Sequence, residues 1–288
     1  MTKAEKITRA KADYDEVYEA GEKAENGRMW DYIQNYGDRS STELMFMAWN
    51  CKYIRPKHKI VATNVSSRRQ TFLSNRSLKI IEKKYFDFTQ CPKSQYPTSN
   101  LEGWYYTFTS CFDLEVIEDI GLCNANIFTH TFNWCGKLHT IECIYPDKDT
   151  KFNKAFDNCG ALTYIRVNGV IGQNIDFKDC PLDVESALSV MRALRNFQMD
   201  VVYADAYDID GFVYTQTYLD EDGDGNGDIL IENPTGNVCY TFPTIYFSEA
   251  TLALLDSTDF STYPEEELPF YHLDGWRCYV ETKRWNIG

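Results

Sequence analysis

One acidic loop carries the residues of this chain whose types and spacing suit metal binding. Carboxylate and amide oxygens at alternate positions are the ligands that Ca²⁺ takes in loop sites. An EF-hand loop ends on a bidentate glutamate, whereas the corresponding position counted from Asp222 is Asn233 here. The loop either binds Ca²⁺ as a cofactor or forms a polar hairpin tip, since Asp-Gly and Asn-Gly steps favour turns. The candidate ligands are Asp220, Asp222, Asp224, Asn226 and Asp228.

A second group that could do chemistry is Cys135, His139 and Cys143, whose spacing suggests metal ligands or a thiol–imidazole pair. Cys135 belongs to a sequence repeat and is expected to point into the core. His139 follows Leu138 on an expected strand and should face the other way, so the register opposes a shared site. The chain also has no phosphate-binding loop, nucleophile elbow, zinc-protease or dinucleotide motif, and the sequence therefore predicts that it is not an enzyme.

The element that must position these residues is a repeat with the pattern F-x-x-C-x-x-L-x-x-I. Three full copies begin at Phe108, Phe132 and Phe156, and successive copies lie 24 residues apart. A shorter copy begins 21 residues later at Phe177, and an earlier one begins at Phe72. A period of about 20–29 residues is the signature of a leucine-rich-repeat solenoid, in which stacked neighbours bury one continuous core.

The cysteines of the repeat predict a structural ladder. If copies stack in phase, the same slot of successive copies should recur about one strand spacing apart, roughly 5 Å. A small thiol packs well in such a core. We therefore expect Cys111, Cys135, Cys159 and Cys180 to be buried, in line, reduced and chemically inert.

The N-terminal residues 4–25 are rich in Ala, Glu and Lys and predict a helix. Ile7, Ala10, Tyr14 and Val17 form an apolar stripe with heptad spacing. Two interpretations of this stripe stay open, because the pattern alone does not separate them. The helix either docks on its own domain or mediates oligomerisation and docking to other proteins.

The predicted fold class is α+β: a short leucine-rich-repeat solenoid with an N-terminal helical segment and a C-terminal β-rich cap. A helix that begins near Pro181, with Asp183 as its N-cap, is expected to close the solenoid. Strand-like runs then cover 211–218, 228–231, 238–242, 244–247 and 275–280, and a short helix covers 248–255. The predicted regions are the N-terminal helix at 1–27, an N-terminal cap at 28–70, the solenoid with its closing helix at 71–200, and the β-rich region with the acidic loop at 201–288.

Composition limits the classes of partner. The chain has 288 residues, a formal net charge of −14 and a pI near 4.8, which argue against nucleic acid as a partner. Its apolar runs are too short to span a bilayer. The first residues lack the apolar segment of a signal peptide, so we expect no membrane association and no export by the general secretory route.

The repeat resembles the BspA-type leucine-rich repeats found in bacterial surface adhesins and in phages of gut Firmicutes. The two ends of the chain look similar to those of repeat proteins in phage and prophage structural gene sets. At the N-terminal end this resemblance rests on residues 14–25, 30–31, 35–39 and 54–57, and at the C-terminal end on 180–194, 251–255 and 275–280. The Asn at position 75 and the acidic insert at 220–228 depart from the family pattern.

The resemblance implies a virion structural protein, such as a tail, baseplate or fibre component, that resides in the virion and is assembled in the host cytoplasm. The implied partners are other virion proteins, a host cell-surface protein or glycan, and further copies of the chain in a homo-oligomer. The family brings no catalytic residues. The alternative is a bacterial surface adhesin or protein-interaction module of the same repeat class.

Overall fold

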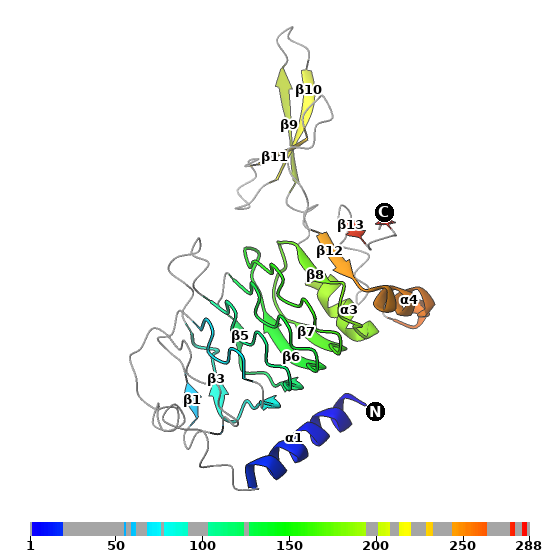
Figure 1. Ribbon diagram of the computed structural model, residues 1–288. Coiled ribbons are helices and arrows are strands. Elements are labelled where there is room, and N and C mark those ends of the chain that lie inside the picture. The colour runs from blue at the N-terminus through cyan, green and yellow to red at the C-terminus, as the bar shows by residue number, and fades with distance from the viewer. Residues whose placement is uncertain are drawn as a thin grey trace.

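The computed structural model describes residues 2–19, 55, 59–61, 68–75, 78–91, 103–123, 127–193, 201–207, 213–219, 229–232, 244–263, 277–279 and 284–286. Within these ranges the fold is α+β (Figure 1). The helices are α1 (Lys3–Glu19), α3 (Val184–Arg192), α4 (Glu249–Ser257) and the 3₁₀-helix η2 (Phe260–Thr262). The strands are β1 (Ile60–Val61), β2 (Ile80–Ile81), β3 (Phe86–Asp87), β4 (Val116–Ile117), β5 (Leu122–Cys123), β6 (Thr140–Tyr145), β7 (Tyr164–Val167), β8 (Ile175–Phe177), β9 (Val201–Tyr207), β10 (Val213–Leu219), β11 (Ile229–Glu232), β12 (Thr244–Phe247), β13 (Arg277–Tyr279) and β14 (Arg284–Asn286).

The central parallel sheet is built from the repeat. Its strand order is β2-β4-β6-β5, and β7 also pairs with β6. Ile117 lies opposite Ile141, and Ile141 lies opposite Ile165, so residues 24 positions apart in the sequence meet in register. β2 joins the same sheet through the pair Ile80 and Val116. Residues that lie one repeat period apart in the sequence therefore pair in adjacent parallel strands.

A column of stacked phenylalanine rings forms the centre of the core. The ring centroids of Phe108 and Phe132 lie 5.6 Å apart, and those of Phe132 and Phe156 lie 5.3 Å apart. The column continues to Phe72 at one end, at 5.0 Å, and to Phe177 at the other, at 4.5 Å. Each of these rings is at most 1% exposed. An offset aromatic pair contributes about 0.5–1.5 kcal/mol beyond its area burial. The phenylalanine that begins each copy therefore stabilises the packing of one copy on the next.

At each full copy the residues two positions before and two positions after the first phenylalanine turn the chain with left-handed backbone, at φ angles between 51° and 63°. A non-glycine residue in this region costs roughly 1–2 kcal/mol. Hydrogen bonds between copies offset that cost: the His130 N–H donates to the Asn153 carbonyl at 2.9 Å, and the Trp134 N–H donates to the Asp157 carbonyl at 3.0 Å. We call the surface formed by residues 105–110, 129–134 and 153–158 the turn face. Its left-handed residues are Tyr106, Ser110, His130, Trp134, Lys154 and Asn158.

Helix α3 covers the open edge of the central sheet at β7. Its N-cap is Asp183, whose carboxylate accepts a hydrogen bond from the Ser186 N–H at 2.8 Å. The Ile165 N–H donates to the Ser186 hydroxyl at 3.0 Å, and the Val167 N–H donates to the Ser189 hydroxyl at 2.9 Å. Two serines of the helix therefore satisfy the edge strand, which would otherwise present unpaired backbone donors.

The C-terminal region adds to the repeat through β8. This strand pairs in parallel with β12, with Ile175 opposite Ile245. β12 also pairs in parallel with β13, and β13 pairs antiparallel with β14. The N-cap of α4 is Ser248, whose hydroxyl donates to the Cys180 carbonyl at 2.8 Å and so fixes α4 to the last repeat copy.

The strands β9, β10 and β11 form a separate antiparallel sheet. These strands, together with β12, α4 and β13, can be compared with the elements predicted for the C-terminal region. The predictions over 211–218, 228–231, 244–247, 248–255 and 275–280 are confirmed over the part of each range that the structure describes, by β10, β11, β12, α4 and β13. The run at 238–242 and most of the predicted cap at 28–70 lie outside the described residues.

Candidate functional site

The repeat cysteines lie in the core as free thiols. Cys111 donates its S–H to the Phe72 carbonyl at 3.0 Å, Cys135 donates to Phe108 at 3.0 Å, and Cys159 donates to Phe132 at 3.1 Å. Each thiol thus bonds to the preceding copy. The same arrangement ends at Cys180, which is also buried and whose thiol lies 3.7 Å from the Phe156 carbonyl.

Burial makes these thiols unreactive near neutral pH. It raises the pKa of Cys111 and of Cys159 to about 12, and it raises the pKa of Cys135 well above its usual value. The thiolate is the nucleophilic and metal-binding form of cysteine. The ladder therefore has a packing and hydrogen-bonding role.

Replacing Cys135 with alanine is expected to lower the free energy of unfolding by about 1–2 kcal/mol, because a buried thiol and its bond to Phe108 are lost. Urea denaturation measures this change. Cys123 is the control, since it is only partly buried and lies outside the cysteine position of the repeat. Equal losses for the two alanine variants would contradict the ladder's role.

The structure does not bring Cys135, His139 and Cys143 together as a site. The Cys135 thiol points to the Phe108 carbonyl, while His139 Nδ1 lies 2.9 Å from the Thr140 hydroxyl. Burial, with a smaller contribution from the Lys6 ammonium, lowers the pKa of His139 to about 4, so its imidazole is neutral at pH 7. In the described part of the chain, no three His, Cys, Asp or Glu side chains are grouped so as to hold a metal ion.

The acidic loop lies outside the described residues, so its candidate ligands cannot be placed: they are Asp220, Asp222, Asp224, Asn226 and Asp228. The strands before and after it are described. Leu219 of β10 pairs with Ile229 of β11 in antiparallel register.

Helix α1 docks on its own domain through the apolar stripe. Ala10 and Tyr14 are fully buried in the core, and Ile7 packs against it. This burial favours the interpretation in which the helix docks on its own domain, and oligomerisation through the stripe stays a prediction. The side chain of Val17 lies outside the described residues.

Polar contacts hold the first turns of α1 against the third full copy of the repeat. The Lys3 ammonium lies 3.5 Å from the centre of the Tyr164 ring, and the Lys6 ammonium donates to the Thr163 hydroxyl at 3.3 Å. These residues stand at the start of β7, so the beginning of the helix lies alongside the late strands of the stack (Figure 1).

The later turns of α1 contact the early copies. Lys11 forms an ion pair with Glu118, which is nearly buried, and Asp13 lies 3.6 Å from Lys79. Arg55 bridges Asp15, at 2.6 Å, and Glu82, at 2.8 Å. Lys79 in the earliest copy and Thr163 in the third full copy hold equivalent positions, just before a strand. Because α1 contacts both residues, it crosses the row of positions that precede the strands. The helix therefore occupies that row.

The turn face is the part of the repeat that exposes aromatic rings. Trp134 of the turn face is 54% exposed, and Phe112, two residues beyond the turn face in the first full copy, is 41% exposed. The rings of Tyr106 and His130 stack at 4.5 Å. Beneath them Asn133 donates its amide to His130 Nδ1 at 3.0 Å, and its buried Oδ1 has no hydrogen-bond partner in the described structure. The exposed Trp134 ring and the Asn133 amide oxygen make the turn face a candidate binding surface.

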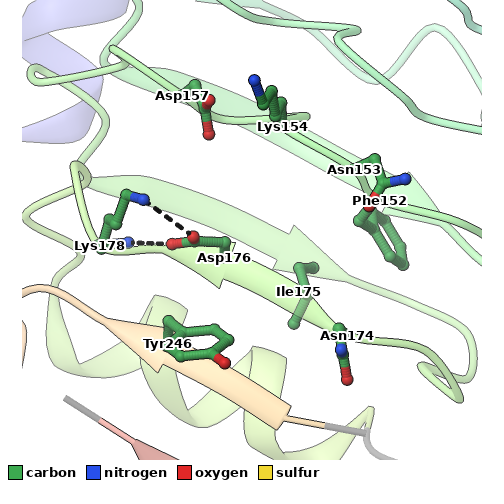
Figure 2. Close-up of a pocket in the computed structure, with 9 residues that line it drawn as sticks. All are labelled: Phe152, Asn153, Lys154, Asp157, Asn174, Ile175, Asp176, Lys178 and Tyr246. Atoms are coloured by element: carbon green, nitrogen blue, oxygen red, sulfur yellow. Dashed lines mark hydrogen bonds and ion pairs between the residues drawn. The ribbon is translucent and has the colours of Figure 1, made fainter. Parts of the chain in front are cut away.

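A groove of about 280 Å³ opens at the end of the turn face, where residues 152–157 meet β8 (Figure 2). Asp157 and Lys154 line one side, and Asp176 and Lys178 line the other. The Lys178 ammonium lies 3.5 Å from the Asp176 carboxylate, and the Lys178 N–H donates to the same carboxylate at 2.8 Å. Tyr246 of β12 lies at the other end from Asp157.

The two sides of the groove are coupled electrostatically. Burial raises the pKa of the Asp157 carboxyl, and the carboxylates of Asp176 and Asp179 act in the same direction. The Lys178 ammonium opposes that rise. The groove thus combines charges of both signs at close range.

Sequence reasoning did not find the groove. The available signal was the spacing between Phe156 and Phe177, which is 21 residues rather than 24. Among the described residues, the shorter copy offers no carbonyl that continues the backbone ladder at Phe152 and Lys154. Tyr246 joins the site only because β12 pairs with β8, and nothing local to residue 246 indicates that pairing.

Comparison of the chain with protein-family models, with curated proteins and with solved structures gave no match. Among the helices that the structure describes, none has the length and apolar character needed to cross a membrane.

Proposed function

We propose that this chain is a bacteriophage virion structural protein in which a BspA-type leucine-rich-repeat solenoid, residues 71–200, presents a surface for host or partner binding. The observation that supports this role best is the in-register stacking of copies that lie 24 residues apart. Such stacking fixes a rigid, extended surface on which one position of each copy recurs at regular intervals.

The turn face is the surface that we assign to binding. Its exposed aromatic rings stand on a ladder of backbone hydrogen bonds, so they are held in place before a partner arrives. Helix α1 already covers the row of positions that precedes the strands. We therefore assign partner binding to the turn face of each copy. Aromatic residues are enriched at the centres of protein interfaces, and rigid presentation lowers the entropy lost on binding.

The proposed location is the virion, with other virion proteins as neighbours and a host cell-surface protein or glycan as the external partner. Assembly as a homo-oligomer in the host cytoplasm is part of the proposal. In the competing proposal the same scaffold is a bacterial surface adhesin or a protein-interaction module.

Purified phage particles test the location. We expect mass spectrometry of gradient-purified virions to detect the chain at a constant ratio to the major capsid protein. Gold-labelled antibody against the chain should then mark one site per particle in electron micrographs, at the tail, baseplate or fibre. Detection on the surface of uninfected host cells, and absence from particles, would favour the adhesin instead.

A further inference from the structure

We propose that the groove between residues 152–157 and β8 binds one ring of a neutral saccharide. The groove, at about 280 Å³, lies near the lower limit for small-molecule sites, which suits one sugar ring. Its walls combine polar and apolar side chains, and they come from residues 152–157, from β8 with the following Lys178, and from β12. This inference names a ligand class for the proposed host-binding role and rests on that role for its biological meaning.

The charges of the groove favour a neutral ligand. Asp157 and Asp176 contribute two carboxylates, and Lys154 and Lys178 contribute two ammonium groups. These four charges sum to zero, so the groove offers no net electrostatic attraction to an anion or to a cation. An apolar ligand would cover polar groups without offering them hydrogen bonds. A sugar hydroxyl both donates and accepts, so a polyhydroxylated ring can satisfy both kinds of group.

Backbone donors add a fixed element of recognition. In the preceding copy the Phe128 N–H donates to the Lys151 carbonyl at 2.7 Å, and the His130 N–H donates to the Asn153 carbonyl at 2.9 Å. The equivalent N–H groups of Phe152 and Lys154, both residues of the groove wall, have no acceptor among the described residues. The next copy is three residues shorter at this point. Two rigid donors are therefore left for a ligand oxygen.

The groove also offers an apolar surface for a sugar ring. Tyr246 is half-buried and lies opposite Asp176 in the pairing of β12 with β8, below it in Figure 2. Tyrosine combines an apolar ring face with a polar hydroxyl. The C–H groups of a pyranose can pack on the ring face while its hydroxyls reach the polar walls.

An extended peptide fits this groove less well than a sugar. A peptide strand needs a continuous row of free backbone groups along the edge that it joins. Here the row stops at Asn158, because its N–H already donates to the Asp179 carboxylate at 2.9 Å. Only a short stretch is left open, which matches a ring better than a strand.

Binding is tested with the purified full-length protein on a printed array of neutral oligosaccharides of hexose and N-acetylhexosamine. The tetrasaccharide with the strongest signal is then titrated by calorimetry. We expect Asp176→Ala and Tyr246→Ala each to weaken this binding at least tenfold. Asp113→Ala is the matched control, since Asp113 also pairs with a lysine, Lys137, but stands on the first full copy. It should change the dissociation constant less than twofold.

Folding and ligand class are checked in the same series. Melting temperatures identify any variant that fails to fold, and Asn153→Ala, a change at an exposed groove residue, then replaces it with the same expected loss. Absence of any neutral oligosaccharide ligand would overturn the assignment. Unchanged binding in the folded groove variants, or groove-dependent binding to a peptide array instead, would overturn it as well.

The groove and the virion role fail independently. A chain found in virions that binds no sugar contradicts the groove assignment alone. A chain that binds sugar through the groove but is absent from virions contradicts the virion role alone.

Discussion

Replacing Phe132 with alanine is expected to lower the free energy of unfolding by about 3–5 kcal/mol, the range for removing a large buried aromatic side chain. The ring lies in the middle of the phenylalanine column and stacks on Phe108 and Phe156 at 5.6 and 5.3 Å. Its removal opens a cavity that the neighbouring rings can fill only by leaving their own stacks. Chemical denaturation followed by circular dichroism measures the loss.

Trp134→Ala is the matched control for Phe132→Ala. The two aromatic residues stand two positions apart in one copy, but Trp134 is 54% exposed. Its truncation should change the stability by about 0.5 kcal/mol or less. If both variants lose the same stability, or if Phe132→Ala loses less than 1 kcal/mol, the column is not what joins the copies.

The second large effect is expected at Tyr14, whose replacement with alanine should detach α1 from the sheet. Tyr14 is fully buried, and the Arg55 guanidinium lies 4.7 Å from its ring. Hydrogen exchange should report the change locally, because peripheral elements open without global unfolding. We expect amide exchange in α1 to rise about 100-fold, equivalent to about 2.7 kcal/mol, while β4 and β6 keep their protection.

Arg9→Ala is the control on the same helix. The Arg9 side chain is 69% exposed, and its ion pair with Asp13 is long, at 3.9 Å. Surface pairs of this kind contribute little. Exchange in α1 should therefore stay within a few-fold of the wild type. A uniform rise across the whole chain in Tyr14→Ala would show instead that α1 and the sheet unfold as one unit.

The repeat was the part of the fold that the sequence predicted best, for a physical reason. Its apolar positions recur every 24 residues, so equivalent residues such as Ile117 and Ile141 are expected to pair. The burial of Cys135 follows from the same regular spacing of the repeat. By contrast, the apolar stripe of α1 was ambiguous, because heptad spacing suits any apolar surface, and only the position of Tyr14 in the core distinguishes the two interpretations.

The groove could not have been predicted in the same way. It depends on a copy that is three residues shorter and on β12, which follows β8 by about seventy residues in the chain. A long-range pairing of this kind leaves no periodic signal. The role of Asp157 is likewise invisible in the sequence, since it depends on which charges β8 brings near that carboxyl.

The length of α1 sets a limit on how this molecule can grow by gene duplication. Its 17 residues span about 25 Å, whereas each added parallel strand lengthens the stack by about 4.8 Å. Lys6 and Asp13 reach Thr163 and Lys79 because their separation of about 10.5 Å along the helix and the roughly 14.4 Å across three strand spacings differ by less than a lysine side chain can span. Duplicating one 24-residue unit would preserve the strand register but shift one anchor away from its partner. About three helical residues would have to be inserted with each unit to keep the match.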